Sequence, residues 1–349
     1  MASATLEIDL DAVIANWRAL DRMSGPGVDT GAVVKADAYG LGAGPVALAL
    51  ARAGARRFFV AQAEEGALLR KTLGPGPEIS VFSGHMAGDA AMIAQSELTP
   101  MLNSVEQLTR HFEALPGHAF GVQLDTGMNR LGMEAAEWEA VAGIVLAAGP
   151  ALLMSHLACS DDPADPMNPE QLHEFIRLTE DTGVPRSLSA TGGILLGPDY
   201  HFEVTRPGIG LHGCAPYQAG QQAVRLSLPV VQWRDVAAGE RVGYANGFVA
   251  DQPTRIATVA AGYADGLART LSGRATLWDG DTPCPLVGRV SMDLITVDVS
   301  HLPDVPDALD ILGPMQGADD LAAVGGTIGY EILTGLGARY ARRYYGGQP

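Results

Sequence analysis

A single lysine, Lys35, lies at the end of a short apolar run in the segment 31–40, which otherwise contains small residues, an aspartate and a tyrosine. The β-branched Val33 and Val34 are typical of a strand buried on both faces, so the lysine that follows them is partly desolvated. Desolvation lowers the pKa of an amine and makes it more nucleophilic, which is what a Schiff-base lysine requires. We therefore predict a covalent site at Lys35. A strand that simply ends in a solvated lysine is the alternative.

Basic and hydroxyl side chains lie in or directly beside four further apolar runs: Arg130, His156, Thr191 and Arg206. Thr191 is followed by two glycines, whose backbone amides suit a phosphate group. If the runs are the strands of a barrel, these side chains converge on one rim, although the chain as a whole is acidic. Such a site suits an anionic phosphate cofactor.

The elements that would position these residues alternate regularly. Eight apolar runs are predicted as strands: 31–36, 57–61, 78–83, 98–102, 118–125, 151–158, 185–191 and 205–213. Helical periodicity lies before and between them, at 10–20, 46–53, 64–72, 105–115, 134–148 and 171–182. Eight β/α units predict a (β/α)8 TIM barrel with its active site at the C-terminal ends of the strands. A doubly wound open sheet remains an alternative on this pattern.

The pattern changes after about residue 220. A linker at 219–222 is followed by short β-like runs with turn residues between them, and by a short helix near 330–336. We therefore predict a barrel domain at 1–222 and a mostly-β domain at 223–349, with the first few residues pairing with the second domain.

Composition excludes several classes of protein. The 349 residues carry a formal net charge of −17, which argues against nucleic acid or an anionic membrane surface as a partner. The three cysteines match neither a disulfide framework nor a zinc spacing, so no metal site is expected. The N-terminal residues lack a signal-peptide pattern, and no apolar run is long enough to span a membrane. These features predict a cytoplasmic protein.

One motif is misleading. Residues 208–213 match the dinucleotide-binding pattern G-x-G-x-x-G. That pattern carries meaning only between a strand and a helix, whereas here it falls within the eighth predicted strand and no helical periodicity follows. We therefore do not predict a nicotinamide or flavin site.

Six segments, in order and spacing, resemble alanine racemases, which are barrel enzymes that use pyridoxal 5'-phosphate (PLP). They cover nearly the whole chain: 31–40, 125–132, 206–209, 242–244, 262–266 and 288–293. The resemblance implies that Lys35 forms the Schiff base with PLP and that Tyr39 lies near its phosphate. It places His156 beside the pyridine ring and Arg206 at the ring nitrogen.

The resemblance assigns further residues to the phosphate and the substrate. Thr191 stands where the family usually has a phosphate-binding serine, and the backbone of Gly208 and Ile209 also faces the phosphate. The remaining implied roles are substrate binding by Arg130, Tyr263, Met292 and Asp293, and catalysis by a second base, Tyr244. In the family the second-domain residues act on the partner subunit's cofactor, which implies a homodimer with shared active sites.

The implied chemistry is coherent. Racemisation of alanine removes the Cα proton on one face and returns it on the other, so two bases, Lys35 and Tyr244, must flank the substrate. Arg206 keeps its own protons, which leaves the ring nitrogen unprotonated and shortens the life of the carbanion. The product D-alanine is a peptidoglycan precursor.

Two positions depart from the family pattern. Gln123 replaces a lysine that is carbamylated in many members. It can hydrogen-bond Arg130 but cannot carry the carbamate charge. Ala338 stands where many members have a tyrosine near the phosphate, with Tyr340 two residues further on. Wider access to the site would weaken strict alanine specificity.

Three other functions remain open. A racemase of the same fold could prefer serine or a broader range of amino acids. An amino-acid decarboxylase of similar plan would need an acidic partner for the ring nitrogen, against which Arg206 argues. A non-catalytic PLP-binding protein would not need the second domain.

Overall fold

The structure is a computed structural model that describes residues 4–348, and the chain forms two units. One unit contains Val13–Gln221, and the other contains residues 4–12 with Gln222–Gly346. We describe each unit by itself. Among the described residues, no helix is long and apolar enough to cross a membrane.

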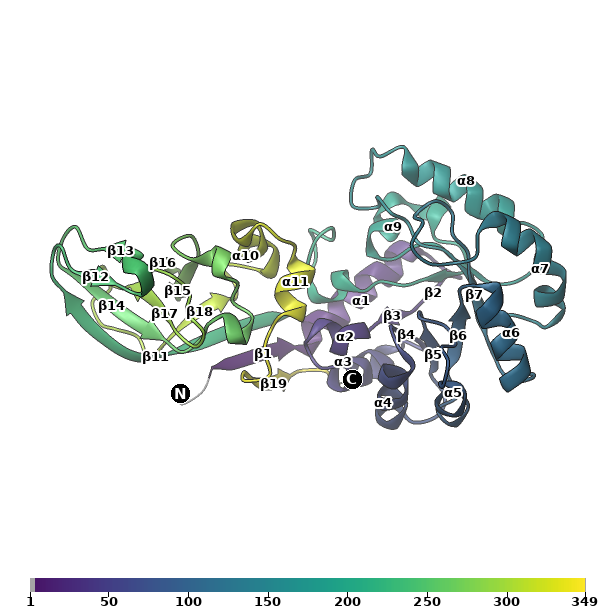
Figure 1. Cartoon of the computed structure of the whole chain (residues 1–349), viewed down its shortest axis with the longest axis horizontal. Coiled ribbons are helices and arrows are strands. Elements are labelled where there is room, and N and C mark those ends of the chain that lie inside the picture. The colour runs from purple at the N-terminus through teal and green to yellow at the C-terminus, as the bar shows by residue number, and fades with distance from the viewer. Residues whose placement is uncertain (1–3, 349) are drawn as a thin grey trace. The chain divides into compact units, whose positions relative to one another are not determined.

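A parallel sheet forms the centre of the first unit (Figure 1). Its strands are β2 (Asp29–Thr30), β3 (Ala32–Val33), β4 (Arg57–Val60), β5 (Glu78–Val81), β6 (Thr99–Leu102), β7 (Gly121–Gln123), β8 (Leu153–Met154), β9 (Arg186–Ser187) and β10 (Val204–Thr205). Strands β3 to β9 pair in sequence order, and β10 pairs with β2, directly before β3. The N–H of Arg206 donates to the carbonyl of Ser189 (2.8 Å), which links β10 to the segment after β9. Strands β2 and β3 are separated only by Gly31 and count as one segment, so the nine strands make eight segments, which close into the predicted barrel.

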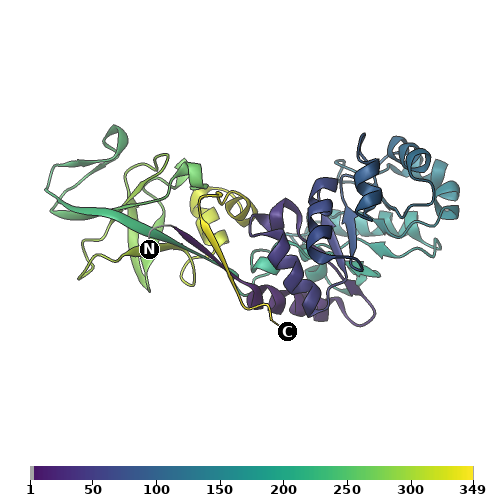
Figure 2. The ribbon, with the colours of Figure 1, turned by 90° about the horizontal axis from the view of Figure 1, so that it is seen from below.

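Helices surround these strands (Figures 1 and 2). They are α1 (Leu10–Ser24), α3 (Ala43–Ala53), α4 (Ala63–Leu73), α5 (Ala90–Gln95), α6 (Val105–Ala114), α7 (Ala135–Ala147), α8 (Met167–Thr179) and α9 (Thr191–Leu196). The barrel interior is filled by apolar side chains from five of the strand segments. These are Val33, Phe59, Met101, Leu152, Met154 and Val204, with Phe82 packed against them. Because side chains fill the barrel interior, we expect an active site at the ends of the strands.

The predicted strands are longer than the observed ones. The largest difference concerns 205–213, where the prediction of extended backbone is wrong beyond Thr205. Residues Ile209–His212 form a 3₁₀ turn instead. The turn begins after Gly208, whose φ of −128° and ψ of −88° are not those of a strand. The glycine-rich motif therefore opens neither a strand nor an α-helix, which agrees with the rejection of a dinucleotide site.

The second unit is mostly β. Its main sheet contains β1 (Thr5–Asp9), β11 (Val224–Val236), β14 (Thr254–Val259), β15 (Thr276–Asp279), β16 (Thr282–Val287), β17 (Ile295–Asp298), β18 (Ala308–Leu312) and β19 (Ala341–Tyr345). Strand β14 pairs with both β17 and β11, so six strands form a ring. Strand β1 lies between β11 and β19 (Figure 2). A small ribbon of β12 (Arg241–Val242) and β13 (Phe248–Val249) and the helices α10 (Ala318–Gly325) and α11 (Gly329–Thr334) complete the unit.

Candidate active site

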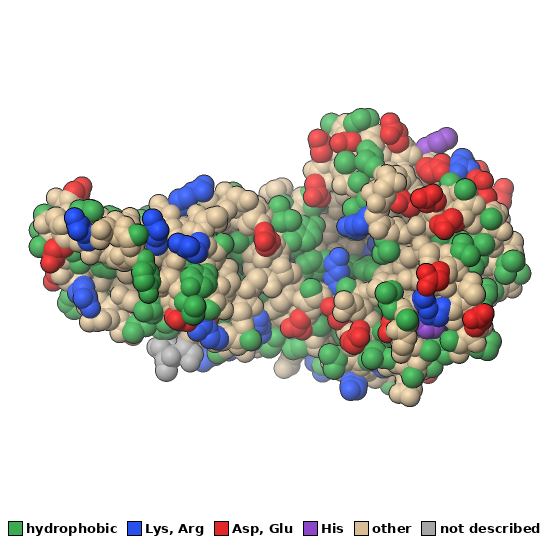
Figure 3. Space-filling model, in the orientation of Figure 1, with side chains coloured by type: hydrophobic (Ala, Val, Ile, Leu, Met, Phe, Trp, Pro, Cys, Tyr) green, Lys and Arg blue, Asp and Glu red, His purple; other side chains and the backbone are tan. Residues whose placement is uncertain are grey.

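A cavity of about 350 Å³ opens at the C-terminal ends of the barrel strands. Its lining residues come from the loops after several strands: Lys35, Ala61, Gln62, Phe82, Ser83, Gln123, Arg130, Leu131, Met154, His156 and Arg206. Four predicted site residues, from segments far apart in sequence, therefore share one cavity. Figure 3 shows basic side chains in a hollow on the barrel unit.

The segment that carries Lys35 is a left-handed turn and not the end of a strand. Strand β3 ends at Val33, and the four residues 36–39 have φ values between 51° and 58°. None of these residues is glycine, and L-residues in this region cost roughly 1–2 kcal/mol each. Two carboxylates hold the turn at its ends. Asp37 Oδ1 accepts the N–H of Ala43 (2.7 Å), and Glu65 Oε1 accepts the N–H of Ala36 (2.8 Å).

The charges in the cavity act on the Lys35 amine. Burial, then the positive charges of Arg130 and Arg206, lower the pKa of Lys35 from its ordinary value. Glu65 acts in the opposite direction. Among residues 4–348, none of the three cations has a carboxylate within ion-pair distance. The cavity therefore has room and charge for an anionic guest.

Phe82 lies near two of these cations, and sequence reasoning missed it. Lys35 Nζ is 5.8 Å and Arg206 Cζ is 6.0 Å from the centre of its ring. The ring also stacks on Phe59, with centroids 5.5 Å apart. A cation near an aromatic face is attracted to it. Phe82 follows β5 directly, so inspection of that strand end would have found it.

Arg206 is held rigidly inside the barrel. Only 2% of the residue is exposed. Its Nε donates to Ser187 Oγ (2.8 Å), and one Nη donates to the carbonyls of Ser155 (2.5 Å) and Leu188 (3.2 Å). Burial lowers the pKa of the guanidinium to about 10, so it remains charged at neutral pH. These partners are all neutral, so the positive charge of Arg206 is not neutralised and can act on an anionic ligand.

His156 is neutral in this setting. Burial, then Arg206 and Arg130, lower its pKa to about 3. Its backbone carbonyl accepts a hydrogen bond from Gln171 Nε2 (3.0 Å). The same Gln171 nitrogen donates to Thr126 Oγ1 (3.1 Å), so α8 fixes the strand end that carries His156. A neutral imidazole retains one acceptor nitrogen for a polar network.

Three of the predicted phosphate residues meet at one place. Thr191 Oγ1 accepts the N–H groups of Gly208 (3.1 Å) and Gly210 (3.2 Å). A Cβ at Gly208 would collide with the hydroxyl of Tyr39, so the tyrosine could keep this position only beside a glycine. Because these two amides already donate to Oγ1, the Thr191 hydroxyl keeps its own hydrogen as a donor that suits a phosphate oxygen. Ile209 follows in the same turn and is buried.

Gln123 does not bond to the Arg130 side chain. Its Nε2 donates to the carbonyl of Leu131 (3.0 Å), and no hydrogen bond between Gln123 and the guanidinium of Arg130 is present among the described residues. The expectation that the amide orients the guanidinium directly is therefore not met. Gln123 holds the backbone of the loop that carries Arg130, which is itself exposed.

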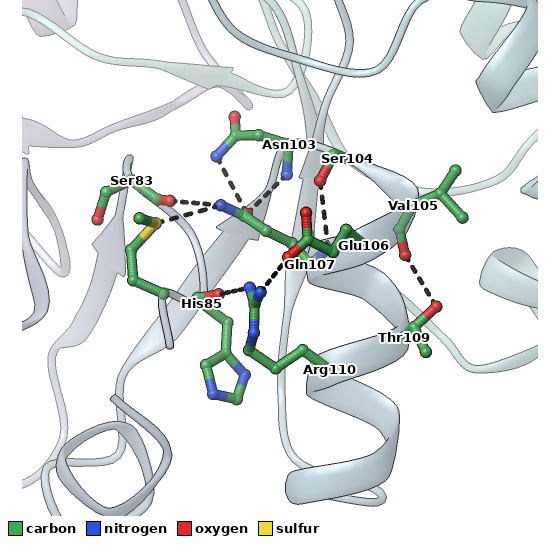
Figure 4. Close-up of polar contacts among 10 residues, drawn as sticks. Ser83, His85, Asn103, Ser104, Val105, Glu106, Gln107, Thr109 and Arg110 are labelled. Atoms are coloured by element: carbon green, nitrogen blue, oxygen red, sulfur yellow. Dashed lines mark hydrogen bonds and ion pairs between the residues drawn. The ribbon is translucent and has the colours of Figure 1, made fainter. Parts of the chain in front are cut away.

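A side-chain network from α6 supports the loop of Phe82 and Ser83 (Figure 4). Gln107 Nε2 donates to the Ser83 carbonyl (2.9 Å), and its Oε1 accepts the N–H of Asn103 (3.0 Å). Asn103 Nδ2 donates to the Phe82 carbonyl (3.0 Å). Ser104 caps α6 by accepting the N–H of Gln107 (3.2 Å). Helix α6 thus fixes two lining residues of the cavity.

The remaining predicted residues belong to the mostly-β unit. Tyr244 begins a 3₁₀ turn after β12 and is 73% exposed. Tyr263 and Met292 are also exposed, and their loops are joined because the N–H of Tyr263 donates to the Ser291 carbonyl (3.0 Å). Asp293 follows in the same loop. The β unit therefore brings Tyr263, Met292 and Asp293 together.

Arg339 fastens these two loops. Its guanidinium donates to both carboxylate oxygens of Asp265 (2.6 and 2.7 Å) and to Asp293 Oδ1 (2.7 Å). The neighbouring Ala338 is exposed, whereas Tyr340 is buried in the unit, and burial raises the pKa of its phenol. Tyr340 is therefore a core residue of the β unit.

The fold and the cavity together define a class of protein. A closed β/α barrel carries a lysine of lowered pKa, two unpaired arginines and a phosphate-type cradle at its strand ends, and a β unit follows. This is the arrangement of a barrel enzyme that holds an anionic cofactor at a lysine.

The chain belongs to the alanine racemase family. The sequence models of the alanine racemase N-terminal and C-terminal domains match residues 8–216 and 223–344. An alanine racemase of Cereibacter sphaeroides is 71% identical over 344 residues, 99% of each chain. One of Dinoroseobacter shibae is 68% identical over 347 residues, again 99% of each. The resemblance predicted from the six segments is confirmed.

Solved structures agree. The alanine racemase of Bartonella henselae, with covalently bound pyridoxal phosphate, superposes with a TM-score of 0.93 at 36% identity and covers 99% of this chain and 100% of its own. The biosynthetic alanine racemase of Pseudomonas aeruginosa gives 0.91 at 35% identity, with 99% and 100% covered. The predicted fold class, a (β/α)8 barrel followed by a mostly-β domain, is confirmed.

Proposed function

We propose that this chain is a PLP-dependent isomerase that interconverts L-alanine and D-alanine. The observation that carries the proposal is the Lys35 amine of lowered pKa, placed with Arg130 and Arg206 in one cavity at the barrel rim. Relatives that are 71% and 68% identical over the full length are alanine racemases.

The residues present fit PLP. Arg206 is charged, buried and bonded only to neutral groups, which suits a hydrogen bond to a pyridine nitrogen. The Thr191 hydroxyl, whose oxygen accepts the N–H groups of Gly208 and Gly210, keeps its own hydrogen as a donor that suits a phosphate oxygen. Lys35 would attach the cofactor covalently, as in the Bartonella henselae structure. Bound PLP withdraws electrons from the substrate Cα and so makes its hydrogen acidic.

The protein's own groups then handle the proton. The lowered pKa of Lys35 favours the uncharged form of its amine, and in that form Nζ can accept the Cα proton on one face. Arg206 retains its protons, so a ring nitrogen held by it would remain unprotonated, which would weaken the ring as an electron acceptor. Arg130 offers a cation to the substrate carboxylate from the rim of the cavity. Rapid reprotonation is favoured over side reactions.

Reprotonation on the opposite face requires a second base, which we propose is Tyr244 of the partner subunit. The β unit presents several exposed apolar side chains that a second copy of this chain would cover: Val231, Trp233, Tyr244, Val249, Tyr263, Met292 and Leu294. Hydrophobic surface is visible on this unit in Figure 3. Tyr263, Met292 and Asp293 would border the substrate in the same shared site of a homodimer.

The cellular role follows from the product. D-alanine is required for peptidoglycan, so the enzyme would supply this precursor in the cytoplasm. Free thiols at all three cysteines suit a reducing compartment.

The test is the circular dichroism of L-alanine, followed with purified PLP-loaded protein. We expect the signal to decay to zero, and that of D-alanine to decay likewise, because both interconvert. Lys35→Ala should abolish covalent attachment of the cofactor, measured as protein mass after borohydride reduction, and racemisation with it. A signal that persists with alanine but decays with serine would reject the proposed substrate.

A further inference from the structure

We propose that Glu65 is a positioning residue for Lys35: it anchors the backbone on which the lysine is mounted and places a negative charge behind it. This inference rests on the proposed function, because Lys35 is the residue that Glu65 would serve. Glu65 does not line the Lys35 cavity. It borders a second cavity of about 300 Å³ behind the turn, together with Val34, Asp37 and residues of α3 and α4.

Both oxygens of the Glu65 carboxylate are engaged. Oε1 accepts the N–H of Ala36 (2.8 Å), which belongs to the peptide bond that joins Lys35 to its successor. Oε2 accepts the N–H of Ala61 (2.7 Å) and, at 3.4 Å, that of Gln62. Ala61 and Gln62 follow β4 and line the Lys35 cavity. One side chain thus ties together the ends of two neighbouring strands at the cavity.

The hydrogen bond from Ala36 to Glu65 lies where the backbone becomes left-handed. Ala36 is the first of the four left-handed residues, and alanine has no intrinsic preference for that conformation. Asp37 holds the far end of the turn through Ala43. Without the bond to Glu65, the near end would be free to adopt right-handed backbone, which would re-aim the Lys35 side chain. Glu65 therefore fixes the direction in which Nζ enters the cavity.

The charge of Glu65 has a second effect. Arg130 and Arg206 lower the pKa of the Lys35 amine, and Glu65 raises it. A base must release its proton and also take one up, so an amine whose pKa fell too far would serve poorly. Glu65 opposes the two arginines from the other side of the turn.

The test uses Glu65→Gln with Glu64→Gln as the matched control. Glu64 is the neighbouring residue in the first turn of α4, is exposed, and loses the same charge on substitution. A glutamine at position 65 has one acceptor oxygen, so it cannot accept from both Ala36 and Ala61. Glu65→Asp, which keeps the charge on a shorter side chain, separates the anchor from the charge, and it carries the anchoring test by itself if Glu65→Gln does not fold.

The first measurement is the pH dependence of Lys35 labelling by an amine reagent in the cofactor-free chain, read by peptide mass spectrometry. In Glu65→Gln we expect the labelling midpoint to move to lower pH, because a nearby negative charge is lost. Glu64→Gln and Glu65→Asp should keep the wild-type midpoint. An unmoved midpoint in Glu65→Gln, or an equal shift in Glu64→Gln, would overturn the electrostatic role.

The second measurement is PLP affinity by absorbance titration. Both Glu65→Gln and Glu65→Asp should bind PLP about tenfold more weakly, since each loses a charge-assisted hydrogen bond to the turn. Wild-type affinity in these variants would overturn the anchoring role. Neither measurement uses racemisation. A wild-type chain without alanine racemase activity would therefore reject the proposed function, while the role of Glu65 would still be decided by the labelling midpoint and the PLP affinity.

Discussion

Arg206 shows how a charge can be buried without an acidic partner. Its donors are directed to one hydroxyl and two backbone carbonyls, so the guanidinium is hydrogen-bonded but not neutralised. A carboxylate in the same place would quench the field that the cavity directs at an anionic guest. The neutral partners also explain why Arg206 lowers the pKa values of Lys35 and His156.

Buried histidines respond to the same low-dielectric interior. Burial lowers the pKa of His212 to about 4, and neither of its ring nitrogens has a hydrogen-bond partner among the described residues. It packs edge-on against Tyr39, with ring centroids 5.4 Å apart. Burial also lowers the pKa of His111 to about 4, and its Nδ1 lies 3.1 Å from that of His85. The imidazole rings of His212 and His111 are therefore neutral in the folded chain.

We expect the stability of the chain to fall as the pH drops from about 6.5 toward 4. In that pH range these histidines are protonated in the unfolded chain but remain neutral in the folded chain. The unfolding free energy therefore falls by about 1.4 kcal/mol per pH unit for each such histidine. His212→Phe should flatten the dependence of the unfolding free energy on pH, measured by urea denaturation from pH 8 to pH 4. Wild-type steepness in this variant would show that His212 does not contribute.

At the scale of elements, the order of strands and helices was predictable, and the turn after β3 was not. The short apolar runs and the helical runs between them follow from the local sequence. The left-handed turn at residues 36–39 contains two alanines and no glycine, so nothing local indicates it. It is set by Glu65, 29 residues further along the chain. Reading strand ends found Lys35 and Arg206, yet missed Phe82 because it fell inside the predicted strand 78–83, where a phenylalanine is usually core.

Helix α6 gives a prediction at this scale. Gln107→Ala would leave the Ser83 carbonyl and the Asn103 N–H without their partner, which should destabilise the chain by about 1–3 kcal/mol. It should also weaken PLP binding, because Ser83 and Phe82 line the cavity. Thr109→Ala on the same helix removes only a bond to the Val105 carbonyl and serves as the control. Equal losses of PLP affinity in the two variants, measured by absorbance titration, would contradict this role for Gln107.

At the scale of the whole molecule, the candidate residues fall on two units. The barrel holds Lys35 with the cofactor residues, and the β unit holds Tyr244 together with Tyr263, Met292 and Asp293. The sequence motifs predicted this division, because each motif lies wholly within one stretch of the chain. If the β unit of one copy serves the barrel of another, as we propose, the pairing depends on how two chains assemble, and no single-chain pattern encodes it.

The most direct test of the shared active site combines two defective chains. Lys35→Ala and Tyr244→Phe are co-expressed with different affinity tags, and dimers that carry both tags are purified and assayed for alanine racemisation. If each site uses Lys35 of one subunit and Tyr244 of the other, one of the two sites in the mixed dimer is intact. We then expect about half the wild-type activity, well above either parent variant. A mixed dimer as inactive as its parents would contradict the shared site.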